Sequence, residues 1–116
     1  MVKLESLKKS YQFQKTLKEK KVHSEFFSIF ATKNFFQPEQ KSSLLISFVM
    51  KKKIGNAVKR NKIRRKLKAI VQKLLKKRGA ISKDYTYIVL GKSNAYTQKQ
   101  TVLMPVMEKC FNKIKI

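Results

Sequence analysis

The 116-residue sequence predicts a small α+β domain, a two-layer sandwich of helices on a sheet. Apolar runs typical of strands lie at residues 25–32, 44–50 and 84–90. Between them and at both ends lie segments whose apolar residues recur at helical spacing. The chain is 42% hydrophobic and contains 8 Phe, which is enough to bury one core. We therefore expect residues 1–116 to form a single domain.

The N-terminal third is expected to form a short helix and then a strand. The helix covers residues 8–20, with larger apolar residues at Tyr11, Phe13 and Leu17. The strand covers residues 25–32, where apolar residues alternate. Because successive strand side chains point to opposite faces, Phe26, Phe27 and Phe30 cannot all face one core. At least one of them is expected on the other face of the sheet.

Two further strands and a final helix are expected after this. Residues 44–50 are apolar on both faces, which is typical of a central strand, and residues 84–90 form the third strand. The polar segment 34–43 is an expected turn or loop, and a last helix covers residues 97–114. Because a long helix joins the second strand to the third, we expect these two strands to be parallel.

The longest expected helix covers residues 56–78, which contain no Gly or Pro. Gly55 permits an unusual backbone angle before it, and Asn56 is a good N-cap. Gly79 is placed to end it. Its apolar residues form one stripe that should face the core: Ile63, Leu67, Ile70, Val71 and Leu74.

The charge of the chain indicates a polyanionic partner. It has 29 Lys and Arg against 6 Asp and Glu, a net charge of +23, and a compact domain with this charge repels itself. Sixteen of these net charges lie in residues 40–83, which contain no acid. A solvated helix normally mixes signs, so this block needs neutralisation from outside the chain. We favour nucleic acid over a membrane surface, because the apolar stripe is needed for the core.

Several classes of protein are excluded. A single cysteine, Cys110, rules out an internal disulfide framework and a Cys-based zinc site, and it fits a reducing cytoplasm. No apolar run approaches the ~18 residues of a membrane span, and no secretory signal is present. The six acids are far apart in sequence, and His23 stands alone. We therefore expect no catalytic residue and no metal site in this chain, so any catalytic groups belong to a partner.

Basic residues flank the apolar stripe of the long helix on both sides, and Arg65 points away from the core. One flank carries Arg60, Arg64 and Lys68. The other carries Lys62, Lys66 and Lys73. The pattern of a helix-turn-helix DNA-binding domain is absent. Exposed aromatic residues near this patch would favour unpaired RNA, because bases stack on them. The candidates are Tyr11, Phe13, Phe27 and Phe30, each of which is alternatively a core residue.

The segment KKKIGNAVKRNKIRR, from Lys51 to Arg65, resembles the signature of the bacterial ribonuclease P protein subunit. That family carries the pattern K-K-x-G-x-A-V-x-R-N-R-x-(K/R)-R where a strand leads into a long helix. The order of elements is similar over essentially the whole chain. The resemblance implies a ribosomal-protein-S5-domain-2-like fold with a left-handed βαβ crossover, where the usual rule for such connections gives a right-handed one.

The resemblance also implies a function. The chain would be the protein subunit of an endoribonuclease whose catalytic component is a large RNA with bound magnesium. It would bind that catalytic RNA and the 5′ leader of precursor tRNA, and so assist tRNA maturation, with no DNA or membrane partner. Carried over by position, the implied RNA contacts are Lys51, Lys52, Lys53, Asn56, Arg60, Asn61, Lys62, Arg64, Arg65 and Lys68. The implied leader contacts are Phe13, Leu17 and Phe30.

Three positions depart from the family pattern. Lys62 replaces the second Arg of the motif, which keeps the charge but loses the bidentate fork. Lys66 stands where a hydrophobic residue is common, and Leu17 stands where an aromatic residue is common. A structural ribosomal protein, with the same charge but no substrate cleft, is the alternative function. A free-standing ribonuclease is a third, which the lack of an acid/base pair disfavours.

Overall fold

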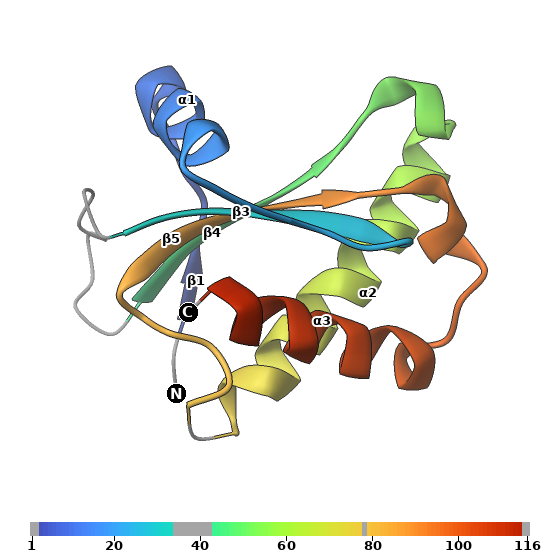
Figure 1. The fold of residues 1–116 in the computed structure, drawn as a ribbon. Coiled ribbons are helices and arrows are strands. Elements are labelled where there is room, and N and C mark those ends of the chain that lie inside the picture. Colours follow the sequence, from blue (N-terminus) through green and yellow to red (C-terminus); the bar gives the residue numbers. More distant parts are fainter. Residues whose placement is uncertain (1–2, 34–42, 78, 115–116) are drawn as a thin grey trace.

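The computed structural model describes residues 3–33, 43–77 and 79–114. Its helices and strands are β1 (Lys3–Glu5), α1 (Ser10–Lys18), β2 (Lys20–His23), β3 (Phe27–Lys33), β4 (Ser43–Met50), the short 3-10 helix η1 (Lys52–Ile54), α2 (Ala57–Leu75), β5 (Tyr85–Gly91), a second 3-10 helix η2 (Ser93–Tyr96) and α3 (Gln100–Ile114). The strands form one sheet in the order β1-β4-β5-β3-β2. Helices α2 and α3 pack on one face of this sheet, and α1 lies on the other (Figure 1).

The predicted α+β class is confirmed, and so is the parallel pairing of the strands joined by the long helix. β4 pairs with β5 in parallel, with Ile46 beside Tyr87 and Met50 beside Gly91. The left-handed sense of this crossover stays a prediction. The interior position of β4 also agrees with its apolar sequence, although β5 is the middle strand. The expected loop over residues 34–43 lies almost entirely outside the described residues.

The sequence did not predict the two edge strands. β1 has 3 residues and β2 has 4, and each contains a single apolar residue, so neither has a recognisable alternating pattern. β1 pairs only with the first part of β4, from Ser43 to Leu45. The second half of β4 therefore forms an edge of the sheet within the described residues.

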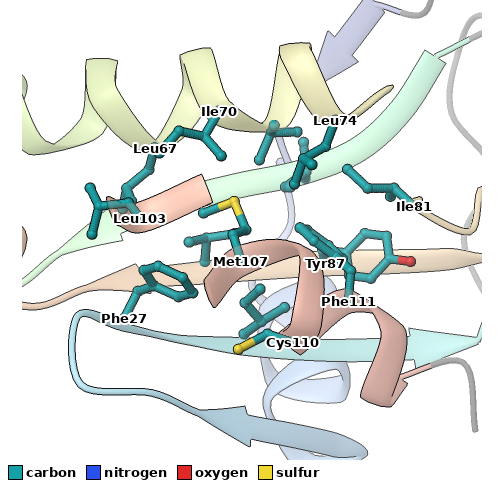
Figure 2. Packing of buried hydrophobic residues seen from close by; sticks show 14 of the residues in the cluster. Phe27, Leu67, Ile70, Leu74, Ile81, Tyr87, Leu103, Met107, Cys110 and Phe111 are labelled. Carbon is teal, nitrogen blue, oxygen red and sulfur yellow. The ribbon is translucent and has the colours of Figure 1, made fainter. Parts of the chain in front are cut away.

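The main core lies between the sheet and the pair α2 and α3. All five residues of the predicted α2 stripe are fully buried there. Figure 2 shows Leu67, Ile70 and Leu74 of α2 facing residues of α3 and of the strands, including Leu103, Met107, Phe111, Phe27 and Tyr87. The Tyr87 ring packs edge-on against the Phe111 ring, with centroids 5.0 Å apart. The stripe thereby fixes how α2 is rotated about its own axis.

The three phenylalanines of the first predicted strand, at residues 25–32, divide between the two faces, as expected. Phe27 is fully buried in the main core, and Phe30 belongs to a smaller cluster on the α1 side of the sheet. Phe26 precedes β3 and joins the main core as well, rather than sharing the face of Phe30. The strict alternation predicted from residue 25 therefore begins only at residue 27.

The start of α2 matches its prediction closely, and its end does not. Gly55 has a φ of +154°, and the Asn56 side chain accepts a hydrogen bond from the Lys59 backbone N–H at 3.0 Å. The helix ends at Leu75, and the left-handed Gly79 lies in the turn that follows. The last helix likewise begins at residue 100 instead of 97, because η2 occupies residues 93–96.

Truncating the α2 stripe should destabilise the domain without changing its charge. We expect Leu67→Ala to lower the free energy of unfolding by about 2–5 kcal/mol, because Leu67 is 0% exposed and its loss leaves a cavity. Val58→Ala on the same helix is the matched control. Val58 is 75% exposed, so its change should be within about 0.5 kcal/mol. Urea unfolding of both variants measures this, and equal midpoints would contradict the described packing.

Candidate RNA interface

The lysines before α2 stand at the point where the chain changes faces of the sheet. Lys51, Lys52 and Lys53 are all exposed. The chain leaves β4, passes through η1 on the side of the sheet that carries α1, and then continues as α2 on the opposite face (Figure 1). The N-terminal turn of α2 carries no acidic residue, so its free N–H groups and helix dipole add to the positive potential.

One flank of α2, which we call the outer flank, consists of Arg60, Arg64 and Lys68. Together with the outward-pointing Arg65, these residues form no ion pair with any described residue. The Arg64 guanidinium donates a hydrogen bond to the Asn61 side-chain oxygen at 2.6 Å, so Asn61 orients it. The Arg60 Nε atom is buried and has no hydrogen-bond partner among the described residues. The outer flank thus presents cations that the fold itself leaves uncompensated.

The other flank, which we call the inner flank, consists of Lys59, Lys62, Lys66 and Lys73. It faces η2 and the start of α3. The Lys66 ammonium donates to the Tyr96 carbonyl at 2.5 Å, the Gln98 carbonyl at 2.8 Å and the Ala95 carbonyl at 3.3 Å. The Lys73 ammonium donates to the Gln100 side-chain oxygen at 2.8 Å. The two basic rows of α2 are therefore not equivalent, because the fold already uses much of the inner one.

Lys66 has a structural role that its sequence position did not indicate. Burial, and secondarily the neighbouring Lys62 charge, lower the pKa of the Lys66 ammonium. Its three carbonyl acceptors lie in residues 95–98, so this lysine fastens the turn before α3 onto α2. A hydrophobic residue at this position could pack there but could not satisfy those carbonyls. No signal in the sequence placed these carbonyls beside Lys66.

A groove of about 340 Å³ lies on the sheet beside α1, and we call it the α1 groove. Its lining residues are Phe13, Leu17, Phe30, Val49, Lys51, Ile88 and Leu90. The two predicted leader aromatics, Phe13 and Phe30, lie on the same side of the sheet, away from the main core. Lys51 supplies a positive charge to this otherwise apolar groove.

The predicted leader residues differ in their exposure. Leu17 is 40% exposed, Phe13 is half-buried, and Phe30 is only 8% exposed. Phe30 packs with Leu7, Leu45 and Ile88, so it belongs both to a small core and to the groove. Of the other aromatic candidates, Tyr11 is exposed at 59%, whereas Phe27 is fully buried in the main core and is unavailable to RNA.

Sequence reasoning missed the apolar floor of the groove, which consists of Val49, Ile88 and Leu90. These residues occupy strands that are apolar on both faces, so they looked like ordinary core. The 9-residue helix α1 covers only part of its face of the sheet, so Val49 and Leu90 stay partly exposed, whereas Ile88, at 1% exposure, lines the groove from a buried position. The shortness of the first helix compared with the strands it covers was the signal that could have revealed this groove.

The described residues contain no group of three or more His, Cys, Asp or Glu side chains placed to hold a metal ion. His23 is exposed on β2, and its Nδ1 lies 2.7 Å from the Ser28 hydroxyl. Cys110 is buried in α3, and burial raises the pKa of its thiol. Among the helices of the described ranges, none is long and apolar enough to span a membrane.

Comparisons with known proteins identify the family of this chain. A family model described as Ribonuclease P matches residues 1–115. The "Ribonuclease P protein component" of Mycoplasma mycoides is 31% identical over 109 residues, which are 94% of both chains. That of Mycoplasma capricolum is 29% identical, also over 94% of both chains.

Solved structures show the same fold. The Staphylococcus aureus RNase P protein superposes with a TM-score of 0.73 at 22% identity, over 96% of this chain and 95% of that one. The Thermotoga maritima RNase P protein gives a TM-score of 0.74 at 21% identity, over 94% of this chain and 96% of that one. Taken with the family model, these matches show that the chain belongs to the ribonuclease P protein family.

Proposed function

We propose that this chain, as the protein component of ribonuclease P, uses two RNA surfaces. The outer flank of α2, with Asn56, Asn61, Lys62, Arg65 and the lysines 51–53, would bind the catalytic RNA. The α1 groove would bind the 5′ leader of precursor tRNA. The observation that carries this proposal is the acid-free outer flank, whose cations have no ion-pair partner in the described part of the chain.

Electrostatics supports the first surface. Phosphate contacts from lysine and arginine supply most of the affinity of a basic protein for RNA, and the release of counterions makes that affinity salt-dependent. Arg64 is held by Asn61, so its guanidinium is already oriented before RNA arrives. Such contacts fix position and orientation without reading sequence. This suits a protein that docks on one large folded RNA.

The shape and chemistry of the α1 groove support the second surface. Unpaired RNA bases stack on aromatic side chains, and the backbone follows nearby positive charge. Phe13 and Phe30 line the groove together with Lys51, whose ammonium would pair with a phosphate. A single strand such as a tRNA leader offers unpaired bases for stacking, whereas the bases in paired regions of a folded RNA are not available for it.

In this proposal, magnesium is bound mainly by the RNA. Mg²⁺ prefers oxygen ligands and usually retains several waters, so phosphate oxygens suit it. Among the described residues, no cluster of His, Cys, Asp or Glu side chains fits a metal ion. The chemical groups for cleavage would belong to the catalytic RNA. A cytoplasmic location completes the proposal, because precursor tRNA and its processing RNA meet there in a bacterium.

The family match does not favour a structural ribosomal protein. The groove adds a physical reason, because a protein that only docks on folded RNA has no need of an open apolar channel beside a lysine. The two functions also make different predictions, because only a ribonuclease P subunit would increase cleavage of precursor tRNA.

The function predicts that the protein assists the RNA when metal is limiting. Added to the ribonuclease P RNA of its own organism at low magnesium, the full chain should increase 5′-leader cleavage of precursor tRNA. The reason is that its cations replace part of the screening that magnesium otherwise provides. Gel analysis of cleavage products measures this. No increase at any salt concentration would contradict the proposed function.

Replacing an outward arginine should weaken docking and lower its salt dependence. We expect Arg65→Gln to weaken binding to the catalytic RNA and to reduce the slope of log K against log salt by about 1. Lys109→Gln, which removes one exposed charge from α3, is the matched control and should leave the slope unchanged. Filter binding at several salt concentrations measures both. Equal effects of the two substitutions would contradict the assignment of the surface.

Changes in the α1 groove should affect leader binding alone. We expect Phe13→Leu to weaken affinity for precursor tRNA by about fivefold or more, because a base loses its stacking ring. Leu17→Phe should strengthen it, because Leu17 is 40% exposed and a ring at that site can face the groove.

Binding of the reconstituted holoenzyme to precursor tRNAs with successively shorter leaders measures these effects. Both should disappear with mature tRNA, which has no leader. If mature tRNA responded equally, the groove would not be the leader site.

A further inference from the structure

The inner flank contains an arrangement of Lys59 and Tyr96 that the two surfaces above do not include, and it joins them to Lys62, which belongs to the first surface. The Lys59 ammonium lies 5.2 Å from the centroid of the Tyr96 ring, and the Lys62 ammonium lies 4.8 Å from it. Tyr96 is half-buried at the end of η2, and its ring packs against the main core. One aromatic ring therefore holds two ammonium groups from successive turns of α2 by cation–π attraction.

The path of the Lys59 side chain is built into the fold. A Cβ atom at Gly55 would lie 2.9 Å from Lys59 Cδ, so the lysine stem occupies the space that the glycine leaves free. Beyond this point the ammonium reaches the Ser93 hydroxyl at 3.1 Å. Gly55, Ser93 and Tyr96 thus guide one side chain from its stem to its charged end.

Lys66 fixes the other partner. Its hydrogen bonds to the carbonyls of Ala95, Tyr96 and Gln98 hold the turn that carries the tyrosine ring against α2. The ring therefore cannot move away from the two lysines without breaking these contacts. The Lys66 ammonium is thus occupied by backbone carbonyls. The ammonium groups of Lys59 and Lys62 are left to bind an anion.

This arrangement concentrates positive charge that is stabilised only by neutral groups among the described residues. Lys59, Lys62 and Lys66 follow one another along a single helix flank, and no acidic side chain of the described residues forms an ion pair with them. Their mutual repulsion is felt, since the Lys62 charge helps to lower the pKa of Lys66. A cation–π contact at an exposed site offsets only part of such repulsion. A phosphate group between the two ring-held ammoniums would offset the rest.

We propose that Tyr96 is a positioning residue that holds Lys59 and Lys62 together as a phosphate-binding pair for the RNA of ribonuclease P. This rests on the proposed function of α2 as the docking helix and extends its surface across the inner flank to η2. The catalytic RNA is the partner favoured over the tRNA leader, because α2 lies on the opposite face of the sheet from α1 (Figure 1), and Phe13 and Leu17 of α1 line the groove. The lysines cover the ring, so the contact is with phosphate and not a stacked base.

A double-mutant cycle with the full-length protein tests this directly. Tyr96→Leu keeps apolar bulk but removes the ring, Lys59→Gln removes one ammonium, and the third variant combines them. Tyr96→Phe retains the ring and should bind like the unchanged protein. Lys109→Gln is the matched charge control on α3. Each is measured for its Kd for the ribonuclease P RNA at several salt concentrations, and for its melting temperature.

We expect Tyr96→Leu to weaken binding about threefold to tenfold and to lower the salt slope, because the lysines no longer meet a phosphate together. Lys59→Gln should lower the slope by about 1, and the combined variant should lose less than the sum of the two. A purely structural role of Tyr96 predicts a lower melting temperature with an unchanged slope. That result, or additive losses, would overturn the proposal.

Two further comparisons keep the test decisive. If Tyr96→Leu does not fold, Lys59→Gln still tests the site, and behaviour identical to Lys109→Gln would overturn the proposal. Arg65→Gln in the same assay separates this proposal from the proposed function. A loss with Arg65→Gln and none with Tyr96→Leu or Lys59→Gln would reject only the phosphate pair. No loss with any of the variants would reject α2 as the docking helix.

Discussion

Burial of one apolar stripe of α2 against the sheet determines where every basic side chain of that helix points. The stripe is fully buried, so the helix cannot rotate without exposing it. With the helix axis fixed, the 3.6-residue period places Arg60 and Lys68 on one side and Lys62 and Lys66 on the other. The direction of the basic side chains of α2 is therefore a consequence of core packing, although none of these side chains belongs to the main core.

The two flanks show how a chain of net charge +23 manages its own repulsion. On the inner flank, backbone carbonyls, a tyrosine ring and the Gln100 amide compensate the lysines. On the outer flank, the buried Arg60 Nε has no hydrogen-bond partner among the described residues, and the Arg64 guanidinium donates to the neighbouring Asn61 amide oxygen. The fold thus places neutral groups around the inner row, whereas neither row has an acidic partner among the described residues, so both rows can still attract a polyanion.

The sequence was informative wherever a local pattern determines structure. The α2 stripe, the Asn56 cap and the separation of Phe27 from Phe30 depend on periodicity and capping, which short segments encode. The edge strands β1 and β2 depend on partners distant in sequence and have no pattern of their own. The groove floor and the carbonyls around Lys66 were also missed, because both arise where separate elements meet.

Because the inner flank carries lysine and not arginine, a neighbouring aromatic ring can help to position its charged groups. Lys62 stands where the family motif has a second arginine, and lysine lacks the planar fork that binds phosphate in a bidentate manner. A flexible ammonium must lose more side-chain freedom when it binds at a defined point. Here the Tyr96 ring restricts that freedom before RNA arrives, since it attracts the ammonium at 4.8 Å. Preorganisation by a neighbouring ring can thus supply part of what the missing guanidinium would have supplied through its own geometry.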